Sequence, residues 1–133
     1  MKNYSQIYLV DDFDMFNLLH KALITKLQVG DQINVFTNPE KALADIRLKL
    51  DESERLLILL DLNMPELSGF EFLDVMTRED FPHFIDVIIA TSSISEKDRT
   101  KAKEYSQYVR DFITKPLKID RLRTILKPLC EAC

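Results

Sequence analysis

The sequence of 133 residues has little glycine or cysteine and no tryptophan. Its two glycines are too few for the Gly-rich loop that cradles phosphates in many nucleotide-binding proteins. The cysteines, Cys130 and Cys133, stand as C-x-x-C at the end of the sequence, whereas a redox motif needs a strand before it and a helix after it. We therefore expect both cysteines to be reduced thiols with no redox or metal role.

Long apolar segments and an excess of positive charge are also missing. The longest apolar run is Leu56 to Leu60, far short of the roughly 20 residues that span a bilayer, and the first residues lack a signal-peptide core. The formal net charge of -4 argues against a basic surface for nucleic acid or anionic membranes. We expect a cytoplasmic protein with no nucleic-acid partner and no membrane contact.

The remaining composition is that of one ordinary globular domain. Hydrophobic residues make up 46% of the sequence and charged residues 30%, which is typical of globular proteins. The length of 133 residues is enough to bury one core and too short for two. We expect residues 1–133 to form a single domain.

Short apolar segments alternate with segments of helical periodicity along the whole sequence. The expected strands are residues 6–10, 33–36, 56–60, 87–90 and 109–113. Residues 56–60 are apolar at every position, as in a central strand that is buried on both faces. The alternation predicts an α/β fold, in which helices cover both faces of a doubly wound, five-stranded parallel sheet.

Capping residues and apolar spacing predict five helices. The first covers about 12–28 and buries a stripe of Phe16, Leu19, Leu23 and Leu27. The second has Asn38 as N-cap, Pro39 at its first position and a stripe of Leu43, Ile46 and Leu50. The third opens on the capping-box pair Ser68 and Glu71 and buries Phe70, Leu73 and Met76. Ser95 and Asp98 indicate a fourth. The last runs from about 119 to 130, with an inward face of Leu122, Ile125, Leu126 and Leu129, and we expect Pro128 to fray or end it.

Polar side chains stand at the ends of four expected strands. Asp11 and Asp12 follow the first strand, Asp61 the third and Thr91 the fourth, and Lys115 comes just after the fifth. Ligands of open α/β sheets bind beyond the carboxyl ends of the strands, so these groups should converge there. Two like charges 4 Å apart repel by about 4 kcal/mol at an effective dielectric of 20, so three carboxylates need a cation. Oxygen ligands alone favour a hard ion such as Mg²⁺, and Lys115 adds a fixed positive charge.

This set of groups predicts phosphoryl-transfer chemistry. With Mg²⁺ bound, an ionised Asp61 can attack a phosphoryl donor and form an acyl phosphate, and Thr91 can hydrogen-bond a phosphoryl oxygen. A carboxylate is already deprotonated at neutral pH, so no general base is required. We accordingly expect His20 and His83 to be structural residues at the surface or partly buried.

Four groups of residues carry a resemblance to a known family. They are Asp11-Asp12; Asp61-Leu62-Asn63-Met64-Pro65, with Gly69 eight residues after Asp61; Thr91-Ser92; and Phe112-Ile113-Thr114-Lys115-Pro116. In this order and spacing they resemble the response regulator receiver domain of two-component signalling, over nearly the whole chain. The resemblance implies a flavodoxin-like strand order 2-1-3-4-5 and a single receiver domain, residues 1–133, with no output domain.

The resemblance also implies roles for individual residues. Asp61 would be the phosphoryl acceptor, and Mg²⁺ would be held by Asp11, Asp12, Asp61 and the backbone carbonyl of Asn63. Thr91 would be the switch hydroxyl and Lys115 the phosphate-binding lysine. Phe112 would be an aromatic switch that turns inward as Thr91 moves, although packing in the core explains a phenylalanine at this position at least as well. The bond between Lys115 and Pro116 would be cis, and Asn63 and Ser93 would tune the acyl phosphate lifetime.

The implied partners are all proteins. The phosphoryl donor would be a sensor histidine kinase or a histidine phosphotransfer protein. A downstream target would bind the fourth helix, fifth strand and fifth helix, around Tyr105, Phe112 and Lys118. A homodimer is left open.

The sequence departs from the family in three places, and two other functions remain open. Tyr108 and Val109 replace a small Gly-Ala pair, Ser92 stands where alanine is common, and two extra residues separate Thr91 from Lys115. One alternative function is a scaffold that works without phosphorylation. The other is a phosphatase of the haloacid dehalogenase type, which also uses an aspartate nucleophile. Such enzymes need a second aspartate two residues later, where this chain has Asn63, so we expect a phosphoacceptor regulator and not an enzyme.

Overall fold

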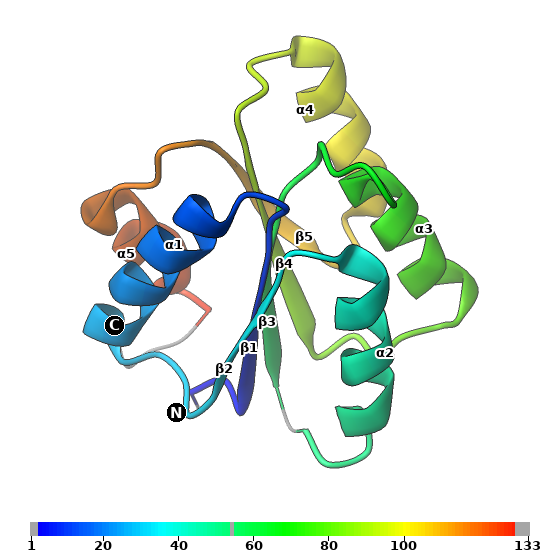
Figure 1. Cartoon of the computed structure of the whole chain (residues 1–133), viewed down its shortest axis with the longest axis horizontal. Helices are drawn as coiled ribbons and strands as arrows, with labels where there is room; N and C mark the ends of the chain where they lie inside the picture. The colour runs from blue at the N-terminus through cyan, green and yellow to red at the C-terminus, as the bar shows by residue number, and fades with distance from the viewer. Residues whose placement is uncertain (1–2, 54, 130–133) are drawn as a thin grey trace.

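The computed structural model describes residues 3–53 and 55–129, in which strands and helices alternate (Figure 1). The strands are β1 (Gln6–Val10), β2 (Ile33–Phe36), β3 (Leu56–Leu60), β4 (Ile85–Thr91) and β5 (Val109–Thr114). The helices are α1 (Asp14–Leu27), α2 (Pro39–Lys49), α3 (Gly69–Arg78), α4 (Glu96–Ala102), the short 3-10 turn η1 (Lys103–Tyr105) and α5 (Ile119–Leu126). Within these residues, no helix is long and apolar enough to cross a membrane.

The strands form one parallel sheet in the order β2-β1-β3-β4-β5, which confirms the predicted fold class and strand order. The central strand β3 is buried at every position. Two strands are longer than predicted: β4 begins at Ile85, and β5 runs on to Thr114. Thr91 is therefore the last residue of β4 and not part of the following loop, and the carboxylate of Asp86 lies within the strand.

Helices cover both faces of the sheet. α1 and α5 lie on one face and α2, α3 and α4 on the other, as Figure 1 shows with the sheet nearly edge-on. Each face has its own apolar core, one including Ile7, Leu57 and Ile88 and the other including Tyr8, Ile58 and Val87. Alternate residues along each central strand thus belong to opposite cores, as expected for a sheet buried on both sides.

The predicted caps are confirmed. Asn38 Oδ1 accepts a hydrogen bond from the backbone N–H of Glu40 (2.9 Å). Ser68 Oγ accepts from the N–H of Glu71 (3.1 Å), and the Glu71 carboxylate accepts from the N–H of Ser68 (2.9 Å), which completes the capping box. Ser95 Oγ caps α4 by accepting from the N–H of Asp98 (3.3 Å). Helix α5 ends at Leu126, two residues before Pro128, so it stops short of residue 130 as the proline predicts. Cys130 and Cys133 lie outside the described residues.

The buried face predicted for α1 is only partly right: Leu27 is buried as predicted, but Leu19 is not. The buried residues of the helix are Asn17, His20, Ile24 and Leu27, whereas Leu19 is 39% exposed and Phe16 and Leu23 are only partly buried. The side-chain amide of Asn17 explains this rotation, because it donates to the backbone carbonyls of Asp11 (2.9 Å) and Phe36 (3.1 Å). A polar residue can be buried where such bonds satisfy it.

The two histidines differ in environment. His20 is 2% exposed, so the expectation that it lies at the surface or partly buried is wrong, whereas His83 is exposed as expected. Burial lowers the pKa of His20 to about 4, an effect that the nearby ammonium of Lys115 reinforces and the charge of Asp11 opposes. His20 is therefore neutral at pH 7.

Tyr108, one of the bulky residues where the family has a small one, lies wholly in the core. Its hydroxyl donates to the carbonyl of Phe81 (2.6 Å), so the polar end of the side chain is satisfied. Its own carbonyl accepts from the N–H of Val87 (2.9 Å) at the start of the pairing between β4 and β5. The larger residue therefore fills core volume on the side of the sheet that α2, α3 and α4 cover.

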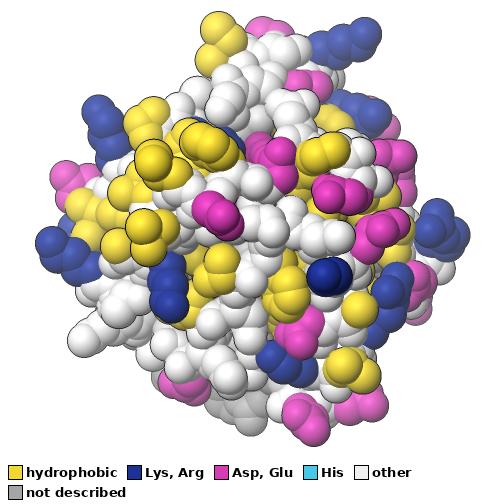
Figure 2. Space-filling model, in the orientation of Figure 1, with side chains coloured by type: hydrophobic (Ala, Val, Ile, Leu, Met, Phe, Trp, Pro, Cys, Tyr) yellow, Lys and Arg dark blue, Asp and Glu magenta, His cyan; other side chains and the backbone are white. Residues whose placement is uncertain are grey.

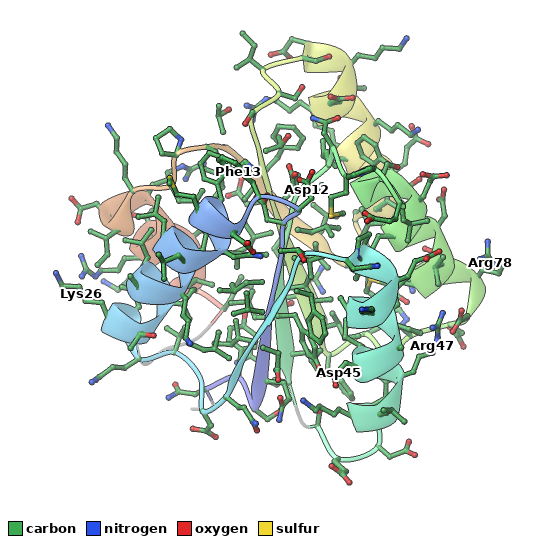
Figure 3. The ribbon with its side chains drawn as sticks, in the orientation of Figure 1. Asp12, Phe13, Lys26, Asp45, Arg47 and Arg78 are labelled. Carbon is green, nitrogen blue, oxygen red and sulfur yellow. The ribbon has the colours of Figure 1, made fainter. Side chains whose placement is uncertain are left out.

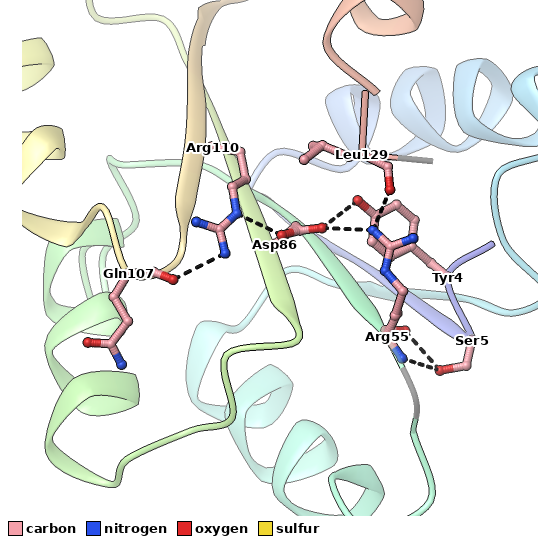
Figure 4. A network of polar contacts seen from close by, with 7 residues as sticks. All are labelled: Tyr4, Ser5, Arg55, Asp86, Gln107, Arg110 and Leu129. Carbon is pink, nitrogen blue, oxygen red and sulfur yellow. Dashed lines mark hydrogen bonds and ion pairs between the residues drawn. The ribbon is translucent and has the colours of Figure 1, made fainter. Parts of the chain in front are cut away.

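A network of polar contacts around Asp86 lies at the end of the sheet where β4 begins (Figure 4). The Asp86 carboxylate accepts hydrogen bonds from the hydroxyl of Tyr4 (2.7 Å), Arg55 (3.1 Å) and Arg110 (2.7 Å). Arg55 also donates to the carbonyl of Leu129 (2.6 Å), just past α5. One carboxylate thereby joins segments next to β1, β3 and α5 to β5.

Candidate functional site

Three carboxylates meet at the carboxyl ends of β1 and β3. Asp11 and Asp12 follow β1 and Asp61 follows β3, and one oxygen from each lies within 4.8 Å of those of the other two. Asp11 is 2% exposed and Asp61 5% exposed, whereas Asp12 is exposed to solvent. Figure 3 shows Asp12 at this end of the sheet, between the start of α1 and the loops beyond the strands. The structure thus brings together the acidic residues selected from the sequence.

Lys115 reaches the same point from the end of β5. Its ammonium Nζ lies 2.6 Å from Asp11 Oδ2 and 3.4 Å from Asp61 Oδ1, and its side chain is 3% exposed. The backbone N–H of Lys115 donates to the carbonyl of Thr91 (2.7 Å), which ties the lysine to the end of β4. The bond to Pro116 is cis, as the resemblance implies.

One buried lysine does not fully offset the acidic cluster. Burial, together with the charge of Asp11, raises the pKa of Asp61 to about 6, against the opposite effects of Lys115 and the backbone N–H of Asn63. A divalent cation between the carboxylates would favour the ionised form. Carboxylate oxygens are the ligands that Mg²⁺ takes in proteins, so the residues present fit this ion.

The cluster opens into a shallow pocket of about 290 Å³. Its lining residues are Asp11, Asp12, Phe13, Phe16, Asp61, Asn63, Ser92 and Lys115. The pocket is wide enough for a small hydrated ion together with a phosphoryl group, and its walls combine carboxylates, one ammonium and two aromatic rings. The hydroxyl-bearing Ser92, at a position where the family often has alanine, is exposed at the rim.

The two predicted switch residues lie behind this pocket. Thr91 is fully buried, and its hydroxyl oxygen accepts a hydrogen bond from the backbone N–H of Ser93 (3.2 Å). Phe112 is 6% exposed in the core on the α4 side, with the Arg99 guanidinium 4.8 Å from its ring centre. The ring already packs in the core, which agrees with the core-packing alternative, and it has no inward turn left to make from this conformation.

Gly69 fixes how closely α3 approaches Asp61. A Cβ atom at Gly69 would lie 2.5 Å from the carbonyl oxygen of Asp61 and 2.9 Å from the Cα of Leu62. The Gly69 N–H donates to the carbonyl of Leu62 (2.8 Å). Only a residue without a side chain permits this contact, so Gly69 relieves crowding between α3 and the backbone of Asp61.

Sequence reasoning missed the aromatic residues of the site. Phe16 was assigned to the core face of α1, but its ring centre lies 4.0 Å from the Lys115 ammonium, and Phe13 also lines the pocket. Phe13 is 56% exposed, and its N–H donates to Asp11 Oδ1 (2.9 Å). The available signal was the pair of phenylalanines three residues apart, directly after the acidic pair, which places them on one side of the helix start.

Comparisons with known proteins agree with this geometry. The model of the response regulator receiver domain family matches residues 7–127. The probable methanogenesis regulatory protein FilR2 of Methanothrix harundinacea is 28% identical over 127 residues, covering 94% of this chain and 81% of that protein. The two-component response regulator ORR24 of Oryza sativa is 25% identical over 103 residues, which are 77% of this chain but 16% of ORR24.

A solved structure shows the same likeness. The two component response regulator from Cytophaga hutchinsonii superposes with a TM-score of 0.83 at 25% identity, covering 96% of this chain and 98% of that one. Phosphorylation and Mg²⁺ binding are characteristic of receiver domains of two-component systems. On the family match, the strand order and the acidic cluster beside Lys115, the chain belongs to the response regulator receiver domain family.

Proposed function

We propose that this chain is a phosphorylation-dependent switch of a two-component phosphorelay, and that Asp61 is its phosphoryl acceptor. The observation that carries the proposal is the convergence of three carboxylates within 4.8 Å of one another on a buried lysine. A structural ion pair would need one carboxylate per lysine. Buried negative charge in excess of the lysine is costly unless a bound cation offsets it.

The chemistry is a single displacement at phosphorus. A carboxylate oxygen of Asp61 attacks the phosphorus atom, an acyl phosphate bond forms, and the bond from phosphorus to the leaving group breaks. The leaving group, an imidazole nitrogen of a phosphohistidine or the oxygen of acetate, keeps the electron pair. Lys115 lies 3.4 Å from Asp61 and stabilises the negative charge on the transferred group.

Asp11, Asp12, Asp61 and the backbone carbonyl of Asn63 would hold Mg²⁺ at this site. When bound, the ion neutralises phosphoryl oxygens in the transition state. Asp11 is fixed for this role by its bonds to Lys115 and to the N–H of Phe13, whereas Asp12 is exposed at the pocket rim.

Thr91 and the surface beyond it would carry the signal. The Thr91 hydroxyl would leave the N–H of Ser93 to bond a phosphoryl oxygen, and this exchange would release the loop between β4 and α4. Ser93 Oγ donates to Asp98 of α4 (2.7 Å), so the loop is linked directly to that helix. The lifetime of the acyl phosphate would depend on Asn63 and Ser93. Because Phe112 is already inward, it would act as a fixed part of the α4 face in this state.

Receiver domains interact with kinases, phosphotransfer proteins and targets. For this chain the donor would be a sensor histidine kinase or a histidine phosphotransfer protein. The target surface would be formed by α4, β5 and α5, around Tyr105, Phe112 and Lys118. A groove of about 310 Å³ between α4 and β5, lined in part by Arg99 and Phe112, lies on this surface. Residues 1–133 would act as one receiver domain without an enzymatic output.

Acetyl phosphate tests the proposal directly. Intact-protein mass spectrometry with and without Mg²⁺ should show a Mg²⁺-dependent gain of one phosphoryl group in the wild type. Asp61→Asn should lose this gain, while the matched control Asp51→Asn, an exposed carboxylate beyond α2, should keep it. If the wild type stays unmodified while a control receiver is phosphorylated, the protein works as a scaffold. Steady turnover of an aryl phosphate would instead indicate a phosphatase.

A further inference from the structure

The ammonium of Lys115 is held on three sides. Among the described residues it contacts Asp11 Oδ2 (2.6 Å), Asp61 Oδ1 (3.4 Å) and the face of the Phe16 ring, whose centre is 4.0 Å away. The first two contacts are with anions. The third is a cation–π contact, which attracts a cation more strongly where water is excluded. With its side chain 3% exposed, Lys115 meets that condition.

The ring of Phe16 is itself held in place. On one side it packs against Phe13, with ring centres 5.5 Å apart and planes tilted by 57°. On the other it stacks on His20, with centres 6.0 Å apart and planes within 28° of parallel. His20 is 2% exposed and therefore fixed by the core. The three aromatic side chains form a row along the start of α1 that presents one ring face to Lys115.

The ring differs from the two carboxylates in what phosphorylation does to it. A cation shared by Asp11 and Asp61 weakens their hold on Lys115, because they must divide their charge between two cations. A phosphoryl group on Asp61 converts its carboxylate into a neutral acyl oxygen and places new anionic oxygens beside the ammonium. The Phe16 ring is the contact that neither event alters, since it carries no net charge and binds no metal.

We propose that Phe16 is a positioning residue for phosphoryl transfer, whose ring holds the Lys115 ammonium beside Asp61 while its carboxylate partners change. This inference rests on the proposed function and names a further residue for the same reaction. A lysine placed before the reaction stabilises transferred charge without reorganising, whereas a mobile one must be ordered during the step.

The functional test is the rate of phosphorylation by acetyl phosphate at saturating Mg²⁺, followed by mass spectrometry. Phe16→Leu removes the ring face and keeps an apolar side chain, and we expect its rate constant to fall about tenfold. Phe16→Tyr retains the ring at a residue that is only partly buried, and should stay within about twofold of the wild type. Leu18→Ala, an exposed site on the same helix, is the control and should not change the rate.

A second readout separates positioning from general damage to the fold. A ring face shifts the resonances of nearby protons upfield, so the Lys115 ε-CH₂ signals should be displaced in the wild type and in Phe16→Tyr, and should return toward ordinary lysine values in Phe16→Leu. Circular dichroism checks that each variant folds. If Phe16→Leu does not fold, Phe16→Met replaces it, because methionine fills the space without an aromatic face.

The outcomes are distinct. Loss of both the rate and the upfield shift in Phe16→Leu, with both kept in Phe16→Tyr, supports the inference. An unchanged rate in folded Phe16→Leu or Phe16→Met overturns it while leaving the proposed function intact. A wild type that accepts no phosphoryl group overturns the proposed function, and the inference falls with it.

Discussion

Lys115 is bonded more closely to Asp11 than to Asp61. Its Nζ lies 2.6 Å from Asp11 Oδ2 and 3.4 Å from Asp61 Oδ1, although Asp11 is 104 residues away in the sequence. In this state Lys115 therefore offsets the charge of Asp11 more than that of Asp61. The carboxylate of Asp61, the proposed nucleophile, is held less tightly. The pair joins the end of β1 to the end of β5, across the ends of β3 and β4 that lie between them in the sheet.

The Lys115–Asp11 pair predicts a strong coupling in stability. We expect Lys115→Met to lower the free energy of unfolding of the metal-free protein by about 3 kcal/mol, because it leaves buried carboxylates without their cation. In an Asp11→Asn background the same change should cost less, with a coupling of about 1–3 kcal/mol. Urea denaturation of the four proteins at pH 7 measures this. Additive effects of the two substitutions would refute the coupling.

The raised pKa of Asp61 predicts a pH-dependent penalty on stability. Burial and the charge of Asp11 raise its pKa from 3.8 to about 6 in the folded state. Between these values the folded protein binds more protons than the unfolded chain, so stability falls as pH rises through this window. Asp61→Asn should therefore stabilise the metal-free protein by about 2 to 3 kcal/mol above pH 6.5 and have little effect near pH 4.

Urea unfolding of wild type and Asp61→Asn across pH 4 to 7.5 checks this sign. Added Mg²⁺ serves as the control, because it binds the wild type and should shrink the difference at pH 7.5. A stability difference that is the same at both ends of the pH range would contradict the assignment of the raised pKa to Asp61.

Gly69 predicts a link between the start of α3 and the acceptor. Gly69→Ala places a Cβ 2.5 Å from the carbonyl oxygen of Asp61, so the helix or the Asp61 backbone must shift. We expect about 2 kcal/mol of destabilisation and slower phosphorylation by acetyl phosphate. Ser68→Ala, which only removes the cap, should cost about 1 kcal/mol and leave the phosphorylation rate unchanged. Equal rates in the two variants would show that the close approach does not matter for the reaction.

Thr91 predicts an incomplete conformational shift on phosphorylation alone. Moving a two-state equilibrium from 1:99 to 99:1 takes about 5.5 kcal/mol, whereas one hydrogen bond to a charged group contributes about 1.5 to 3 kcal/mol. The Thr91 hydroxyl must also give up its bond from Ser93. NMR of the isolated phosphoprotein should show two populations, shifted to one by a binding partner. A single active conformation without a partner would disprove this prediction.

The sequence predicted the strand ends well and the helix faces less well. The apolar strands located Asp11, Asp61 and Lys115 at one edge, because a parallel sheet aligns its carboxyl ends. The buried face of α1 was only partly predicted because hydrophobicity alone does not show that Asn17 can bond two backbone carbonyls. The acceptors are the backbone carbonyls of Asp11, just after β1, and Phe36, at the end of β2, and folding places both beside Asn17.

The contacts between side chains of distant segments were not predictable either. The two distances from Lys115 to the carboxylates, and the approach of the Phe16 ring, join residues that lie far apart in the sequence. The contact between Phe112 on β5 and the Arg99 guanidinium on α4 is of the same kind. A periodic pattern predicts the orientation of a helix only to within about one residue, and a rotation smaller than this is enough to make or break such contacts.

The Asp86 network determines how the protein would bear mechanical load. Tyr4 lies near the start of the chain and Leu129 near its end, and both are bound to this one cluster, Tyr4 through its hydroxyl on Asp86 and Leu129 through Arg55. A force that pulls the two ends apart would act on these bonds and on the backbone bonds of Tyr4 to Val29 and Asp31, at the end of the strands opposite Asp61. We therefore expect tethering of the protein by its ends, to a surface or to fused partners, to load this end of the sheet before the carboxyl ends of the strands.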